Sequence, residues 1–505
     1  MAERPLGARR RDSELPEPQR NEQLRRIDWR FLLSGPEEPR VIDLTPGRDS
    51  DALRLISSPA GPGEADLVLA GFPSAAVLRS ALDALAPGGE VVCRWWGPRL
   101  AGPQRARRRL RRAGFQDCRL YWAGPLPWRA PQFWLPLDSR SATTHLLAGR
   151  PADDVASAGL RRFWRLAVRL GLLAPVYAVA RAPGGEENGP DPDSGAALLL
   201  TGGHRSINKV VALDFQPGTS RPQAASKFAR VAEAEPGLER EATVLARLRD
   251  EGRTLEGIPG YRGRLRRGGR VGVVESAVDG DSMLDRLTPK SLAEMARRVN
   301  DLLIELAETR SEAPRAGIED ALELFEGRFG FALTSDQLAQ LRAAAERVAD
   351  LPVVCEHRDC SPWNVVLGNR DRPVLLDWES AEPDGLPALD LVYFLANAAF
   401  VLDGALEDGT TRASYRRLLD PTSAYGKIAA AETGRYFEAL GLDLEALPSL
   451  RLLCWMVHCH SDYEHLRLAA AGEPAPQDLR GAPFLGLLLE ELDLQAAVRG
   501  GGVAP

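Results

Sequence analysis

The stretch that most constrains the fold is residues 181–195, RAPGGEENGPDPDSG, because it has no apolar periodicity and is rich in glycine, proline and acids. Such a composition is typical of a linker between folded parts. The chain has 505 residues, which is more than one hydrophobic core usually holds. The sequence therefore predicts separate domains on either side of a linker at residues 184–196.

Before the linker, short apolar strands alternate with helices. Strand-like RVIDL and ADLVLAGF are followed by the helical AAVLRSALDAL and the strand-like GGEVVCRWW. This order favours parallel strands in a βαβ layer. We therefore expect an α/β, Rossmann-like domain over residues 26–183. Residues 1–25 are polar and arginine-rich, and they are predicted to be a disordered tail.

After the linker the pattern changes. AALLLTG, KVVALDF and AASKFARV read as strands, LEREATVLARLRDEG as a helix, and the periodicity becomes mainly helical from about residue 289. We expect an α+β, two-lobed domain, with a mostly β lobe at residues 197–286 and a mostly helical lobe at residues 287–497. A cleft between two such lobes is a common place for a ligand.

Polar side chains concentrate directly behind one apolar run. EHRDCSPWN supplies His357, Asp359 and Asn364, and Asp377 follows at the end of the strand-like RPVLLD. Two strands that flank a short loop would bring these residues to one edge. Oxygen ligands of this kind suit Mg²⁺, which indicates Asn364 and Asp377 as ligands. Asp359 could instead accept a proton from an attacking hydroxyl.

Positive charge for phosphates is available upstream, although the chain contains only four lysines. Lys227 lies in the strand-like AASKFARV, and Glu241 follows on the next helix. Kinases hold the α- and β-phosphates with a strand lysine that is oriented by a helix glutamate. Gly202 and Gly203 lie between two strands, where backbone N–H groups could approach phosphate. Glu239 is the alternative partner for the lysine.

The stretches HRDCSPWN and LLDWESAEPDGLPALDLVYFL resemble the catalytic loop and metal-binding segment of the aminoglycoside phosphotransferase and choline kinase family, which has a protein-kinase-like fold. The resemblance covers about residues 197–495. It implies ATP- and Mg²⁺-dependent transfer of the γ-phosphate to a hydroxyl of a small molecule. The site residues it implies are Asp359 as the catalytic base, Asn364 and Asp377 as magnesium ligands, Lys227 and Glu241 as the phosphate-positioning pair, and Asp390 as a buried structural acid. It also implies a hinge at about residues 274–276, where the backbone at Glu275 would meet adenine. His357 is placed with Asp359 in the catalytic group, and Gly202, Gly203 and Ser206 are further candidate nucleotide contacts.

Within that set, His357 is expected to hold the loop through hydrogen bonds rather than to move protons. Two departures from the family leave the substrate class open. Ser361 stands where many members carry a second histidine, and the glycine loop is short and holds His204 and Arg205.

The N-terminal part resembles, more faintly, the C-terminal half of a class I S-adenosylmethionine-dependent methyltransferase, through ADLVLAGF, LAPGGEVV and RRAGFQDCRLYW. A methyltransferase of this type needs a glycine-rich turn after its first strand, and this chain supplies Gly47 alone there. Loss of cofactor binding is the preferred interpretation. Two alternatives to a kinase remain: a non-catalytic nucleotide-binding scaffold, and a methyltransferase with an accessory kinase-like half.

Composition restricts the partners. The formal net charge of −6 argues against nucleic-acid binding, and no sufficiently long window is free of charge, so no membrane span is expected. The basic amphipathic stretch at residues 161–173 could touch a membrane surface, but packing on its own domain is preferred. Six scattered cysteines fit a reducing cytoplasm. The cluster from Cys454 to His465 could bind a metal, but the preferred account is that some of its residues pack in the core and others line the substrate end of the cleft. Asp462 and Glu464 would then be candidates for contacting a cationic substrate.

Overall fold

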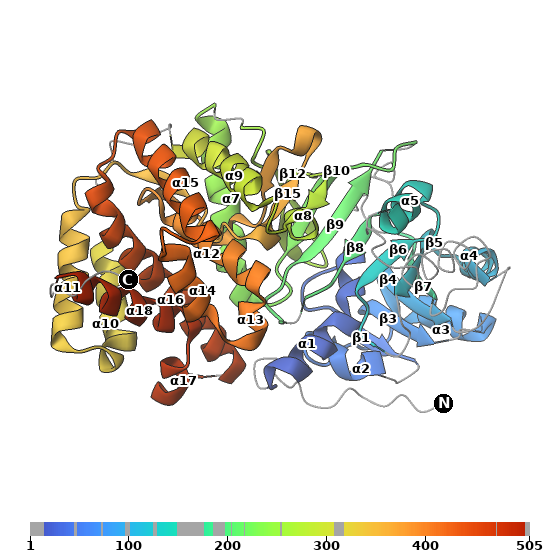
Figure 1. Cartoon of the computed structure of the whole chain (residues 1–505). Helices are drawn as coiled ribbons and strands as arrows, with labels where there is room; N and C mark the ends of the chain where they lie inside the picture. The colour runs from blue at the N-terminus through green and yellow to red at the C-terminus, as the bar shows by residue number, and fades with distance from the viewer. Residues whose placement is uncertain are drawn as a thin grey trace. The chain divides into compact units, whose positions relative to one another are not determined.

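The computed structural model describes residues 15–44, 48–71, 74–95, 102–124, 129–148, 176–184, 197–203, 205–216, 218–252, 255–307, 318–470 and 472–499. The chain divides into two compact units (Figure 1). The first unit consists of Met1–Leu238 and Tyr261–Ala277, and the second of Glu239–Gly260 and Val278–Pro505. The described residues do not include the amphipathic stretch at residues 161–173, residues 185–196 of the linker or the turn at Gly47. A described helix begins directly after Gly47.

The first unit is built on one sheet of twelve strands. Its order is β11-β12-β10-β9-β8-β6-β5-β7-β4-β3-β1-β2. The strands are β1 (Arg40–Asp43), β2 (Ser58–Pro59), β3 (Ala65–Gly71), β4 (Leu85–Trp95), β5 (Gln116–Gly124), β6 (Phe133–Pro136), β7 (Val176–Arg181), β8 (Leu198–Leu200), β9 (Val210–Phe215), β10 (Pro222–Phe228), β11 (Tyr261–Arg267) and β12 (Arg270–Ser276).

The pairing in this sheet differs from the expected parallel layer. Strands β1, β2, β3 and β4 pair in parallel, as the strand–helix–strand pattern predicts. Beyond β4 every described pairing is antiparallel, beginning with β4 and β7. Strand β5 follows β4 along the chain but does not pair with it, because β7 lies between them and is antiparallel to both. The sheet is mixed, and a separate Rossmann-like domain is therefore not confirmed.

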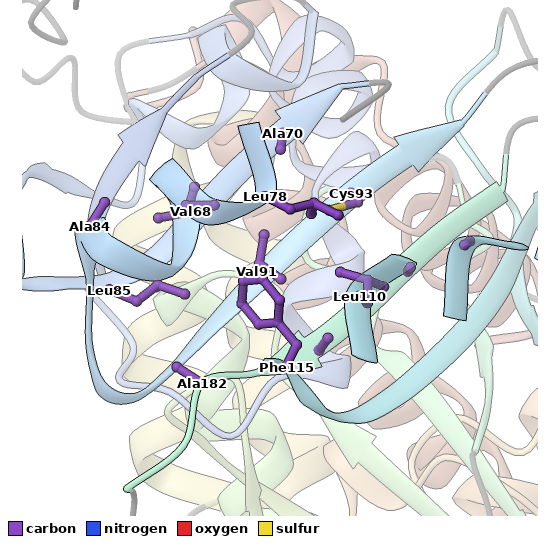
Figure 2. Packing of buried hydrophobic residues seen from close by; sticks show 14 of the residues in the cluster. Val68, Ala70, Leu78, Ala84, Leu85, Val91, Cys93, Leu110, Phe115 and Ala182 are labelled. Atoms are coloured by element: carbon purple, nitrogen blue, oxygen red, sulfur yellow. The ribbon is translucent and has the colours of Figure 1, made fainter. Parts of the chain in front are cut away.

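Helices cover the parallel end of the sheet. The helices of the first unit are α1 (Glu17–Arg26), α2 (Arg48–Leu53), α3 (Ala75–Ala84), α4 (Gly102–Ala113) and α5 (Arg140–Ala148), with the 3₁₀ turns η2 (Asp28–Leu32) and η3 (Ala232–Ala234). Helix α4 buries Ala106 and Leu110, which are one turn apart, and turns its arginines outward. Figure 2 shows Leu78 of α3, Leu110 and the neighbouring Phe115 gathered around Val91 and Cys93 of β4.

A second core cluster joins the two sides of the predicted linker. Trp122 and Leu135 pack with Leu198, Leu213 and Ala225, which come from strands after the linker. Strand β6 also pairs with β8 through Trp134 and Leu199. The predicted N-terminal domain and the strands of the predicted β lobe therefore share one sheet and one core.

A buried ion pair fastens the N-terminal segment to the same sheet. The Nε of Arg230, just after β10, lies 3.0 Å from Oδ2 of Asp28 in η2, and neither side chain is exposed. Arg230 also donates to the backbone oxygen of Thr201 at 3.2 Å. Burial raises the pKa of Asp28, and the neighbouring Arg230 opposes that rise. Where the sequence predicted a disordered tail to residue 25, the structure has α1 from Glu17 onward.

The second unit is mainly helical. Its helices are most of α7 (Glu235–Asp250), then α8 (Met283–Arg286), α9 (Leu292–Ala307), α10 (Ile318–Phe329), α11 (Ser335–Arg347), α12 (Leu389–Asp403), α13 (Ala405–Asp408), α14 (Thr411–Leu419), α15 (Ala424–Leu440), α16 (Leu447–Ala470), α17 (Pro476–Arg480) and α18 (Pro483–Arg499). Its strands are β13 (Asp281–Ser282), β14 (Val354–Glu356), β15 (Val365–Leu367), β16 (Pro373–Leu375) and β17 (Glu382–Gly385).

Helix α12 is the centre of the second unit. Its residues from Leu389 to Phe400 are all buried, and it packs against α9, α14 and α16. A helix that is apolar all round needs such cover on every side. This burial fixes the position of Asp390 in its first turn.

We expect Arg230→Met to lower the free energy of unfolding by about 3–5 kcal/mol, because Asp28 would remain buried without its partner. Denaturant unfolding measures this effect. The control is Arg297→Ala, which removes an exposed pair with Asp301 and should cost under about 1 kcal/mol. The combined change Asp28→Leu with Arg230→Met should recover part of the loss. Equal effects of Arg230→Met and Arg297→Ala would contradict the assigned role.

Candidate functional site

The loop that follows β14 is held by one buried carboxylate. Asp390 accepts the backbone N–H of His357 at 2.6 Å and that of Arg358 at 2.8 Å. Arg358 has a φ of 60°, a conformation that is uncommon outside glycine. Two hydrogen bonds to one side chain stabilise this conformation, and they fix the direction in which the next residue, Asp359, leaves the loop.

His357 connects the loop to the end of β16. Its ring is fully buried, and Nε2 lies 2.9 Å from the backbone oxygen of Leu376. The backbone N–H of Asp359 donates to Nδ1 at 3.3 Å. Since Nδ1 accepts, the proton of the neutral ring lies on Nε2 and is donated to Leu376. The structure gives His357 the bonding of a positioning residue, which agrees with its expected structural role.

Asp359, Asn364 and Asp377 lie beside the small sheet that is formed by β13, β15 and β16. The Nδ2 of Asn364 donates to Oδ2 of Asp359 at 2.7 Å and to its backbone oxygen at 3.0 Å. The backbone oxygen of Asn364 accepts from Leu376 at 2.8 Å, which brings Asp377 beside it. Asp377 itself has a φ of 70°. A strained acid at the end of a strand is a frequent feature of functional sites.

The acids of this edge repel one another. Burial raises the pKa of Asp359 to about 7, the negative charge of Asp377 adds to the rise, and the hydrogen bond from Asn364 opposes it. Burial and the nearby negative charge of Asp359 raise the pKa of Tyr393, which lies on the second turn of α12. A buried group with a strongly shifted pKa beside a like charge is typical of a catalytic or cation-binding site.

The donor set fits magnesium. Asn364 uses its amide nitrogen on Asp359, which leaves the amide oxygen as the atom available to a cation. Asp377 adds a carboxylate, and Mg²⁺ commonly combines one or two protein oxygens with phosphate and water. In the described part of the chain, no group of three or more histidine, cysteine or acidic residues is arranged to hold a metal ion, so a cation here would depend on two side chains together with phosphate and water.

The cluster from Cys454 to His465 has other contacts. Cys454 donates to the backbone oxygen of Leu389, and His458 stacks on Tyr393 with ring centres 3.7 Å apart. His460 contacts the backbone oxygen of Ala321. These side chains turn to separate partners, so packing accounts for them better than a metal site does.

In the first unit, Lys227 lies on β10 and is buried. Its Nζ is 3.0 Å from Oε1 of Glu275 on the neighbouring strand β12. In the second unit, Glu241 of α7 accepts the backbone N–H of Trp378 at 3.1 Å, next to Asp377. The pairing of Lys227 with Glu241 stays a prediction. The side chain of Glu275, which was expected to contribute through its backbone, is the partner that sequence reasoning missed.

The glycine segment is covered by α1. The backbone oxygen of Gly203 accepts from Arg25 at 3.3 Å and from Asn21 at 3.5 Å. Ser206 is buried, and its Oγ donates to Oε2 of Glu17 at 2.8 Å, while its backbone N–H contacts the other carboxylate oxygen. Gly203 has a φ of 94°, and a Cβ there would collide with the side chain of Asn208. His204 lies outside the described residues.

A cavity of about 290 Å³ opens beside Asp359 in the second unit. Its described lining includes Tyr393, His458 and Phe484. The sequence analysis singled out His458 as part of the cluster from Cys454 to His465, but it did not select Tyr393 or Phe484. Tyr393 had a detectable signal, because it follows Asp390 by three positions and so lies one helical turn away. Phe484 comes from a helix far along the chain, and no local pattern marks it.

Glu356 is another residue that sequence reasoning missed. It is buried, accepts the backbone N–H of Leu386, and receives Nε of Arg358 at 2.7 Å. A Cβ on Gly385 would lie 2.3 Å from the Glu356 side chain, so that position requires glycine. Burial raises the pKa of Glu356, and Arg358 opposes the rise. Glu356 therefore fixes the guanidinium of Arg358 at the rim of the cavity.

We expect Asp359→Asn to reduce the pH dependence of stability. The pKa of Asp359 is raised from 3.8 to about 7, so the folded state keeps a proton that the unfolded state has released. Its contribution is present below pH 4 and is lost as the pH rises through about 7. Between pH 5 and 8 without divalent cations, wild-type protein should lose roughly 1–3 kcal/mol more than the variant.

Denaturant unfolding at both pH values measures this difference. Asp350→Asn changes an exposed acid of the same unit and should behave as wild type. An Asp359→Asn variant with the full wild-type pH dependence would show that Asp359 titrates normally.

Comparisons with known proteins bear on the family of this chain. Residues 212–430 match the family described as "APH: Phosphotransferase enzyme family". This match confirms the phosphotransferase resemblance predicted from HRDCSPWN and the segment after it. A search of curated proteins finds no match.

Solved structures of low identity are also similar. An aminoglycoside phosphotransferase of Streptomyces rimosus, in complex with ADP and streptomycin, is 15% identical over 49% of this chain and 90% of its own, with a TM-score of 0.33. An aminoglycoside phosphotransferase of Alicyclobacillus acidocaldarius is 18% identical over 58% of this chain and 90% of its own, also with a TM-score of 0.33. The methyltransferase resemblance stays a prediction.

Proposed function

Since residues 212–430 match the phosphotransferase enzyme family, we propose that this protein transfers the γ-phosphate of ATP to a hydroxyl group of a small molecule. The observation that carries the proposal is the bonded set at the end of β16, where Asn364 joins Asp359 and lies beside Asp377. Asp359 of this set also lines a cavity large enough for a small molecule. Among the described residues no helix is both long and apolar enough to cross a bilayer.

Asp359 is the proposed base. An acceptor hydroxyl in the cavity would donate its hydrogen bond to the Asp359 carboxylate and give up its proton as the oxygen attacks the γ-phosphorus and ADP leaves. Asn364 holds the carboxylate in one orientation. His357 would act as a positioning residue, because it ties the backbone of Asp359 to Leu376. Phosphoryl transfer relies mainly on such positioning and on charge stabilisation.

Different side chains would hold the metal ion and the phosphates. Asn364 and Asp377 would hold a magnesium ion, which when bound neutralises charge on the phosphate oxygens. Lys227 would contact the α- and β-phosphates, and its ion pair with Glu275 holds the ammonium group in one position. Gly202, Gly203 and Ser206 would offer backbone N–H groups to phosphate. Glu241 supports the site by holding the backbone next to Asp377.

We expect Asp359→Asn to lower phosphotransfer by about 10²–10⁴-fold while leaving ATP binding largely intact, because the change removes the base and keeps the shape. The measurement is mass spectrometry of a metabolite extract incubated with ATP and Mg²⁺, in search of a gain of one phosphate. Asp350→Asn is the control. A wild-type protein that binds ATP and phosphorylates nothing would instead favour the non-catalytic scaffold.

A second prediction concerns α1. The Glu17 carboxylate contacts Ser206, where a phosphate oxygen would otherwise meet a free N–H group. Two anions compete for such a position, so Glu17→Gln should tighten MgATP binding about fivefold, equivalent to roughly 1 kcal/mol. The amide can still accept from Ser206, which keeps the loop in place. Calorimetric titration of the full chain measures the affinity.

The matched control is Glu22→Gln on the same helix, where the carboxylate pairs with Arg26 at the surface. This change should leave MgATP affinity at the wild-type value. Unchanged or weaker binding in Glu17→Gln would show that Glu17 supports the loop without competing with phosphate.

A further inference from the structure

We infer that the cavity beside Asp359 accepts an uncharged hydroxyl compound with an aromatic or apolar face, and that it rejects polycationic acceptors. The inference rests on the proposed function and names its substrate class. Three features of the described lining carry it: the small number of carboxylates, a wall of stacked rings, and several short polar side chains.

The cavity offers little negative charge to a cation. Two of its described lining residues carry a carboxylate, Asp359 and Glu379, and Arg358 contributes a positive charge at the same rim. Asp359 already accepts a hydrogen bond from Asn364. An ammonium group that leaves water needs a carboxylate partner, and an acceptor with several ammonium groups needs several. This lining cannot supply them.

Nearby acids do not change this balance, because they serve the fold. Asp462 of α16 is buried and accepts the backbone N–H of Phe484 at 2.8 Å. Glu464 pairs with Arg328 at 3.1 Å and with Arg467 at 2.8 Å. Neither is among the lining residues of the cavity. The sequence suggested both as contacts for a cationic substrate, and the structure gives them other partners.

One wall of the cavity is aromatic. His458 stacks on Tyr393, with ring centres 3.7 Å apart and an angle of 11° between the ring planes. The ring centre of Phe484 lies 5.3 Å from that of His458. Burial lowers the pKa of His458 to about 3, so its ring is neutral at physiological pH. Phe400 and Leu487 extend the apolar lining. A planar or apolar group gains contact area against such a wall.

The remaining lining suits hydroxyl groups. Asn397, Thr411 and Ser461 present short, uncharged donors and acceptors to the cavity. The volume of about 290 Å³ lies at the lower end of the usual range for small-molecule pockets, roughly 300–1,000 Å³. A compound of the size of a nucleoside or an aryl monoglycoside fits this volume better than an amino-trisaccharide does.

The test compares phenyl glucoside with its 2-amino-2-deoxy analogue, which differ by one ammonium group. Wild-type protein with MgATP should show a kcat/KM about 100-fold higher for the neutral compound. Ser461→Asp adds a carboxylate to the lining and should reduce this preference at least about tenfold, whereas Ser461→Asn keeps the lining neutral and should preserve it. Equal or better use of the amine by wild-type protein would overturn the inference.

A second variant tests the aromatic wall. Phe484→Ala should raise KM for phenyl glucoside about tenfold and change KM for methyl glucoside less than about twofold. A uniform change for both acceptors would mean that Phe484 only supports the fold, and the aromatic part of the inference would be wrong.

Direct binding separates this inference from the proposed function. Calorimetry of both compounds with the Asp359→Asn protein measures selectivity without turnover. Selective binding of the neutral compound, with no phosphate transfer by wild-type protein to any acceptor, would support the inference and contradict the proposed function. Failure of the neutral compound to bind at millimolar concentration, or selective binding of the amine, would contradict the inference whatever the turnover.

Discussion

The candidate site depends on the carboxylate of Asp390, which accepts two successive backbone N–H groups from the loop after β14. Asp390 can do this because α12 is buried on all sides and cannot shift. His357, fixed by the first of these bonds, then ties the loop to the strand that delivers Asp377. The positions of Asp359, Asn364 and Asp377 thus follow from packing in the second unit, and hydrogen bonds between the polar residues adjust them.

The sequence was sufficient to group Asp359, Asn364 and Asp377, because these residues are close along the chain. Asp359 and Asn364 share one loop, and Asp377 follows at the end of the next hairpin, so spacing and strand pattern were sufficient. The partner of Lys227 was harder to predict. Glu275 reaches Lys227 through the pairing of β10 with β12, and strand pairing between distant segments leaves no local pattern.

The division of the chain was the least predictable part. Residues 181–195 have the composition of a linker, yet β6 before it and β8 after it are neighbours in one sheet. The N-terminal segment was equally hard to predict. The sequence around Asp28 does not distinguish it from an acid at the surface. Its burial is possible because it pairs with Arg230, which is about two hundred residues away along the chain. A buried charge can be recognised from the sequence only when its partner is known.

Burial at the reactive edge also explains why charge on the acceptor matters so much. Taking Asp359 out of water strengthens its interaction with every nearby charge, because the local dielectric constant falls. The same desolvation that raises the pKa of Asp359 keeps His458 neutral and leaves an incoming ammonium group without hydration. A site that prepares a carboxylate to accept a proton from a hydroxyl therefore discriminates against cations, unless further carboxylates are placed around the acceptor. The described lining of this cavity has Glu379 in addition to Asp359, and Arg358 stands beside them.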